Sequence, residues 1–283
     1  MSQRFFDPDS VIWRVNRELV LLLGGGRALL MQIAHPKVAT GVAQHSRFRE
    51  DPIGRLLPTM NAMWSIVFDE NPEAQVSLER IKQIHRRVRG TVEEGSVLLA
   101  GTPYDAQDPD LLLWVHATLI DSAIMAYELF VSPLSVEEKR QYYDESKRLA
   151  LLFGVPEAKI PPSLDIFNGY MKEMIASDTI TVGSAARAVA NDILYPRPLI
   201  LKVGGPLSAL ITTGLLPLKL RREYGLTWND RKQKVLELLG SLIRTILPIA
   251  PLTLRIAPHA RSAQKKTVTV YDKTNLEWQK SRR

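Results

Sequence analysis

Cysteine is absent from this 283-residue sequence, and its absence removes several kinds of chemistry at once. Disulfides, iron–sulfur clusters, zinc–thiolate sites, thiolate-ligated haem and cysteine nucleophiles all require a thiol. Histidine is scarce, with five residues in the whole chain. Any bound metal must therefore use one of these histidines, a carboxylate, or a rarer ligand such as tyrosine or methionine.

The motifs of several common enzyme classes are also missing. Glu-x-x-His occurs at none of the five histidines, which argues against a ferritin-like di-iron site. There is no His-Glu-x-x-His and no Gly-x-Ser-x-Gly. A triple glycine at residues 24–26 precedes a predicted helix, but no strand comes before it and no phosphate-loop pattern follows. We therefore predict close packing between two helices at this point.

Excess positive charge is concentrated near the C-terminus. The chain has a net charge of +7, and residues 259–283 contain seven basic and two acidic residues, a net charge of +5. The near-neutral remainder predicts no nucleic-acid partner. We expect residues 259–283 to form a solvated, partly disordered tail, with weak contact to an anionic membrane as the alternative.

Long hydrophobic runs are likewise lacking. Residues 1–10 do not have the pattern of a signal peptide. The longest uncharged stretch, residues 203–218, is short for a membrane span and is interrupted by glycine and proline. These features predict a cytoplasmic protein, with peripheral membrane association as the alternative.

Helix signals recur along almost the whole chain. Asp-Pro or Asn-Pro pairs stand at positions 7, 51, 71 and 108, where a capping side chain precedes a proline in the first helical turn. The sequence predicts an all-α domain of about ten helices over residues 1–258. The expected helices cover residues 10–23, 26–35, 52–67, 72–100, 109–131, 136–153, 164–176, 185–194, 207–215 and 230–247.

One histidine lies in the most apolar of these helices. Residues 111–125 leave no polar stripe, so this helix is expected to be buried on nearly all sides. A buried imidazole needs a partner for at least one nitrogen. His116 is therefore either a core residue bonded to a backbone carbonyl or a metal ligand in an apolar cavity, which suits haem. Asp121 lies on a different face and is predicted to bond a neighbouring helix.

A second histidine, His85, lies in a strongly basic helix. Its apolar neighbours place it at the rim of a core, and the cations around it form an ordinary solvated face in the simplest interpretation. Arginines at this position would alternatively suit the carboxylates of a haem. His35 and His45, ten residues apart across a helix break, are interpreted as structural.

Taken together, the motifs form a combination that resembles the oxygenase MpaB family, whose catalytic domain is shared with the rubber oxygenases called latex clearing proteins. The resemblance covers roughly residues 7–263. The residues that carry it are Gly25-Gly26-Arg27 with Ala34-His35-Pro36, Gln44-His45-Ser46, His85-Arg86-Arg87, Leu113-Trp114-Val115-His116-Ala117 and Tyr224-Gly225-Leu226.

The resemblance implies a globin-like haem b domain in which a histidine on a core helix is the proximal iron ligand. Val115-His116-Ala117 fits that position, so His116 is assigned as the metal ligand. Trp114, His85 and Arg89 are assigned to the cofactor site with it. His85 would be either a sixth ligand or a distal hydrogen-bonding group.

The family's distal helix lies upstream and carries Arg, Lys and Thr near the iron. Counting back from His116 reaches Lys82, His85 and Arg86, which are therefore assigned as distal catalytic residues. The stretch that corresponds to the distal carboxylate of the rubber enzymes, residues 61–68, contains no acid. Cleavage of polyisoprene is accordingly not expected.

The function that the resemblance implies is a haem b-dependent oxygenase that acts on a lipophilic small molecule with O₂ or peroxide. Two alternatives stay open. One is a non-catalytic protein that binds haem through two histidines, or binds another apolar ligand. The other is a cofactor-free helical protein that docks on membranes through residues 203–218 and the basic tail.

Overall fold

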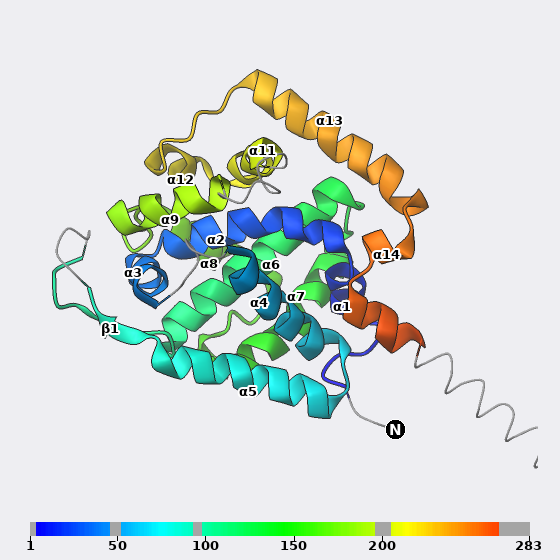
Figure 1. The fold of residues 1–283 in the computed structure, drawn as a ribbon, viewed down its shortest axis with the longest axis horizontal. Coiled ribbons are helices and arrows are strands. Elements are labelled where there is room, and N and C mark those ends of the chain that lie inside the picture. Colours follow the sequence, from blue (N-terminus) through cyan, green and yellow to red (C-terminus); the bar gives the residue numbers. More distant parts are fainter. Residues whose placement is uncertain (1–3, 46–51, 93–97, 196–204, 266–283) are drawn as a thin grey trace, which may run out of the picture.

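The computed structural model describes residues 4–45, 52–92, 98–195 and 205–265. Nearly all regular structure within them is helical, which confirms the prediction of a mainly α fold (Figure 1). The helices are α1 (Val11–Asn16), η1 (Leu19–Gly24), α2 (Gly25–Ile33), α3 (Pro36–His45), α4 (Pro52–Phe68), α5 (Asn71–Arg87), α6 (Pro109–Phe130), α7 (Val136–Phe153), η2 (Glu157–Lys159), α8 (Leu164–Ala176), α9 (Ser184–Leu194), α11 (Gly205–Leu215), α12 (Leu218–Glu223), α13 (Asp230–Ile246), η3 (Leu247–Ile249) and α14 (Leu252–Arg255).

Helix α6 is the centre of the fold, and α2, η1, α7 and α13 pack around it (Figure 1). It begins where the Asp108 side chain accepts a hydrogen bond from the Asp110 amide, with Pro109 in the first turn. By length and composition α6 is apolar enough to cross a membrane. It is also mostly buried by other helices, as the core helix of a globular domain is.

The first predicted helix, residues 10–23, is wrong in one respect, because it is broken into α1 and η1. Glu18 adopts extended backbone between them and pairs with Ile256 in an antiparallel bridge. Its buried carboxylate accepts two hydrogen bonds of 2.9 Å from the guanidinium of Arg255. The break thus serves a contact with a segment more than 200 residues away, which no local pattern reveals.

The predicted helix over residues 72–100 ends early, and the part beyond Arg87 is corrected to a strand. Strand β1 (Arg89–Thr91) pairs antiparallel with β2 (Pro103–Asp105), with Gly90 opposite Tyr104. A Cβ at Gly90 would lie 2.8 Å from the Tyr104 hydroxyl, so the hairpin needs glycine at that position. Residues 93–97 lie outside the described part of the chain.

Other helix boundaries follow local signals. Ser135 and Glu138 form a reciprocal capping box at the start of α7, and Gly154 ends the helix with a φ of 97°. Helix α3 was not expected, because Pro36 was interpreted only as the end of the preceding helix. Proline in the first turn in fact starts a new helix. The chain bends by 108° between residues 19–33, which form η1 and α2, and α3.

The C-terminal end of the body lies further along the chain than residue 258. Residues 258–265 are helical, and Ala260 and Ala263 are buried in the main core. His259 also bonds the Asp69 carboxylate at 2.8 Å. The packed body therefore continues to residue 265, and the rest of the expected tail, residues 266–283, lies outside the described residues.

Candidate functional site

The imidazole of His116 lies on the central helix without a hydrogen-bond partner. Its Nε2 is fully enclosed and bonds no other atom in the described part of the chain. The other buried side-chain atoms without a partner there belong to arginines and Asn71, so His116 is the histidine among them. Burial lowers the pKa of His116 to about 4, because the charged form loses its hydration. The ring is therefore neutral near pH 7, with a lone pair available on one nitrogen.

His35 shows what a satisfied buried histidine looks like in the same protein. Burial, together with the nearby charge of Lys37, lowers its pKa to about 4 as well. Its Nδ1 accepts a hydrogen bond of 3.2 Å from the backbone amide of Lys37. Among the described residues, His35 therefore has a backbone partner of the kind that a core histidine uses, and His116 does not.

One face of α6 around His116 stays partly accessible. Leu112, Val115 and His116 are half-buried, and Leu119 is 40% exposed. These positions recur every three or four residues, so they share one side of the helix. The result is a partly accessible apolar surface beside the imidazole.

Trp114 points away from this face. It stands two residues before His116, which is about 200° around the helix. Its ring is fully buried, and its indole N–H donates to the backbone carbonyl of Met31 at 3.2 Å. In this position Trp114 fixes α6 against α2. Its side chain faces the core and not the side of α6 that carries His116.

Asp121 bonds a neighbouring helix, as its place in the sequence predicted. Its carboxylate accepts a hydrogen bond of 2.6 Å from Nη2 of the buried Arg27. The same guanidinium donates to Ser122 Oγ and to the carbonyl of Leu215, each at 2.7 Å. Arg27 thus joins α2, α6 and the end of α11, and it holds the helix that carries His116.

The triple glycine makes this close packing feasible. A Cβ at Gly24 would lie 2.9 Å from Ala126 Cβ, and one at Gly26 would lie 2.2 Å from Thr212 Oγ1. Gly24 therefore lies too close to α6, and Gly26 too close to Thr212 on α11, for either position to hold a larger side chain without a shift. The prediction of helix packing instead of a phosphate loop is confirmed.

The residues assigned to the distal side come from α5 and the strand after it. His85 is half-buried, and its ring lies 6.3 Å from that of Phe153 between centroids. Lys82 and Arg86 both approach the carboxylate of Glu79, at 3.4 and 3.6 Å. Arg89 is exposed at the start of β1. The structure thus places Lys82, His85 and Arg86 together on α5.

Sequence reasoning missed two polar pairs that join distant segments. Asp69, just beyond the acid-free stretch 61–68, bonds Nδ1 of His259. Exposed His45 contacts the Tyr104 hydroxyl at 3.0 Å, and Tyr104 donates in turn to Gln44. No signal in the sequence could have paired these residues, since each pair spans 59 positions or more.

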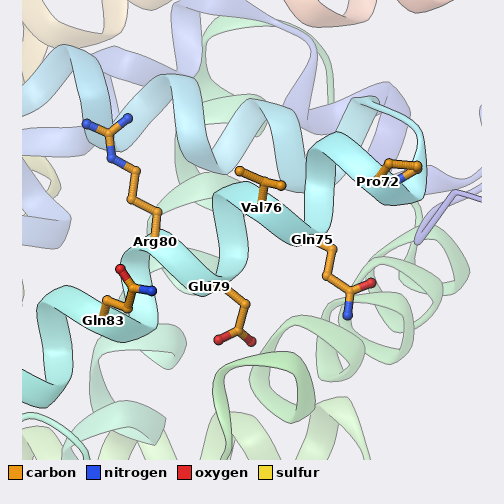
Figure 2. Close-up of a pocket in the computed structure, with 6 residues that line it drawn as sticks. All are labelled: Pro72, Gln75, Val76, Glu79, Arg80 and Gln83. Atoms are coloured by element: carbon orange, nitrogen blue, oxygen red, sulfur yellow. The ribbon is translucent and has the colours of Figure 1, made fainter.

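Two shallow surface hollows lie away from His116. One involves Ala43, Gln44, Gly90 and Thr91. Figure 2 shows the other, whose lining comes entirely from α5 and consists of Pro72, Gln75, Val76, Glu79, Arg80 and Gln83. Neither hollow combines a nucleophile with a base. Among the described residues no group of three or more His, Asp or Glu side chains is placed to hold a metal ion.

Comparison with known proteins covers most of the chain. An uncharacterized protein of Mycobacterium bovis and one of Mycobacterium tuberculosis are each 28% identical over 237 residues, which are 82% of this chain and 88% of the relative. No solved structure was found to match. The family described as ER-bound oxygenase mpaB/B'/Rubber oxygenase, catalytic domain, matches residues 13–245, which include α6 and His116. The chain therefore belongs to this oxygenase family, as the sequence motifs indicated.

Proposed function

We propose that this protein is a haem b-dependent oxygenase that oxidises a lipophilic small molecule, with His116 as the iron ligand in a globin-like site. Membership of an oxygenase family makes it an oxygenase-type enzyme. The observation that carries the finer proposal is the enclosed, unpartnered Nε2 of His116 on the central helix.

The residues around His116 fit a haem. A buried polar atom left without a partner costs about 1–3 kcal/mol, and a bond to iron would offset that cost. The neutral imidazole supplies the required lone pair. The described residues offer no cluster of several protein ligands, so a metal held by one histidine, with a porphyrin supplying the other nitrogens, suits this donor set.

The chain's own residues would divide the work between holding the cofactor and receiving the substrate. The apolar face of Leu112, Val115 and Leu119 would contact lipophilic groups of the cofactor or substrate. Arg27 and Asp121 keep α6 in place. A bound haem would supply the capacity to bind and activate O₂ or peroxide.

The basic residues upstream are proposed for the distal side and the haem carboxylates. Lys82, His85 and Arg86 share α5 and would supply hydrogen-bond donors and a proton on the distal side. Arg89, exposed on β1, suits a propionate. These roles rest on the family resemblance alone, whereas that of His116 also rests on its enclosed Nε2 without a partner.

Haem titration of the full chain tests the proposal. Adding haem to the purified protein should produce a Soret band, and the pyridine complex of the extracted cofactor should have the spectrum of haem b. His116→Ala should weaken haem binding at least about tenfold, because the bond between the imidazole and the iron would be lost. His45→Ala is the matched control, since His45 is an exposed histidine away from α6, and it should bind haem like the wild type.

The state of the sixth position separates an oxygenase from a closed bis-histidine protein. Reduced protein that binds CO has an open position, as the proposal requires. A spectrum unresponsive to CO, which becomes responsive in His85→Ala, would instead favour the non-catalytic alternative. No Soret band in the wild type, or an unchanged band in His116→Ala, would refute the ligand assignment.

A further inference from the structure

An exposed apolar stripe runs along the outer side of α13. Val235, Leu238, Leu242 and Ile246 are 50, 71, 56 and 48% exposed. Their spacing of three, seven and eleven residues places them on one face of the helix. A neighbouring face, around Leu236, packs into the core with α6 and α11. Only part of the apolar surface of α13 is therefore covered by the protein, and the helix lies at the outer edge of the molecule (Figure 1).

Further exposed apolar side chains follow in the two short helices after α13. Ile249 in η3 is 82% exposed, and Leu252 and Leu254 in α14 are 63 and 72% exposed. Seven of the twenty exposed large apolar side chains among the described residues thus fall within residues 235–254. Scattered exposed leucines are ordinary, but seven exposed large apolar side chains within twenty residues of sequence mark an interaction surface.

The charge of the chain is concentrated in the same region. Residues 230–283 contain twelve basic and four acidic residues, a net charge of +8, whereas residues 1–229 have a net charge of −1. Within the described residues 230–265 there are seven basic and two acidic residues, a net charge of +5, so the segment that carries the stripe is itself positively charged. An apolar face with surrounding Lys and Arg is typical of a helix that lies in the headgroup region of an anionic bilayer.

A second copy of this chain fits the surface less well. A symmetric dimer places the same patch of both subunits together, so two copies of residues 230–265, each with a net charge of +5, would meet. An anionic bilayer removes this repulsion and accepts the leucines at the same time.

We propose that the surface formed by Val235, Leu238, Leu242, Ile246, Ile249, Leu252 and Leu254 docks the protein on anionic membranes as a peripheral protein. This goes beyond the oxygenase function and does not depend on haem binding, because the surface contains none of the residues proposed for the haem site. The stripe enters the boundary between headgroups and acyl chains, and the surrounding cations contact lipid phosphates.

Co-sedimentation of the full chain with lipid vesicles tests this proposal. The vesicles are pure phosphatidylcholine or a roughly two-to-one mixture of phosphatidylcholine and phosphatidylglycerol, each at low and high salt. The wild type should bind the anionic vesicles more tightly than the neutral ones, and salt should weaken that binding. The triple variant Leu238→Gln/Leu242→Gln/Ile249→Gln should bind anionic vesicles at least about tenfold more weakly than the wild type, because three large apolar groups no longer enter the bilayer.

The control variant Val76→Gln/Leu218→Gln removes two equally exposed apolar side chains from other parts of the surface and should bind like the wild type. Circular dichroism and thermal unfolding verify that both variants fold. Haem absorbance of the triple variant, unchanged from the wild type, keeps this test separate from that of the oxygenase.

Three results would overturn the proposal. The first is wild-type protein that stays in the supernatant with both kinds of vesicle. The second is a triple variant that binds vesicles like the wild type. The third is a wild type that ignores vesicles but sediments as a dimer in solution while the triple variant is a monomer, which would assign the surface to self-association.

Discussion

The strongest structural prediction concerns Arg27, the buried cation that ties three helices together. Its guanidinium is almost fully enclosed and makes three hydrogen bonds of 2.6–2.7 Å, to Asp121, Ser122 and the carbonyl of Leu215. Arg27→Met keeps the length and apolar stem of the side chain. It removes the charge and all three donors, so the acceptors on α6 and α11 lose their partner.

The expected loss follows from what is left behind. Breaking a buried ion pair by removing one partner costs about 3–5 kcal/mol. The Asp121 side chain is 25% exposed, so water can reach it and the lower end of this range applies, about 3 kcal/mol. For a chain of this size that loss lowers Tm by about 5–10 °C.

Chemical and thermal unfolding followed by circular dichroism measure this loss. Arg80→Met, which changes an exposed arginine on the outer face of α5, is the matched control and should change stability by less than about 0.5 kcal/mol. Since α6 carries His116, Arg27→Met should also weaken haem binding. A loss of under about 1 kcal/mol in Arg27→Met would refute the idea that this cation holds the core together.

Two single contacts and one buried imidazole give three further predictions. Gly26→Ala should destabilise the fold by about 2 kcal/mol in denaturant titration, because its Cβ would meet Thr212 Oγ1 at 2.2 Å, and Thr212→Ala should restore part of the loss. The pKa of His116 is lowered to about 4 on folding, so the unfolded chain takes up its proton first. Stability of the haem-free protein should fall as pH drops from about 6.5 to 4, by about 3 kcal/mol from this residue, and the fall should be smaller in His116→Gln. Arg255→Met should cost about 3 kcal/mol, since Glu18 is buried and loses two hydrogen bonds; an unchanged Tm would contradict that role.

The parts of the fold that were predictable are those with local causes. Asp108 before Pro109 starts α6, and Ser135 with Glu138 starts α7, because each cap is complete within a few residues. The end of α5 was not predictable, since strand β1 exists only by pairing with β2. The break at Glu18 depends on Arg255, which is distant in sequence.

The candidate site divides in the same way. The position of His116 in an apolar helix can be seen in the sequence, and so can the need of its imidazole for a partner. Whether that partner exists depends on every segment packed against α6, so the structure alone distinguishes His116 from the satisfied His35. The pairing of Asp69 with His259 is invisible for the same reason.

The central claim, that His116 is the residue that binds the iron of a haem, is tested most directly by chemical rescue. His116→Gly removes the imidazole and leaves a space of its shape, which free imidazole can enter. The His116→Gly protein should lose the Soret spectrum of the wild type, and added imidazole should restore it. The spectrum of His35→Gly should not change when imidazole is added. A His116→Gly protein that binds haem with the wild-type spectrum before any imidazole is added would contradict the account.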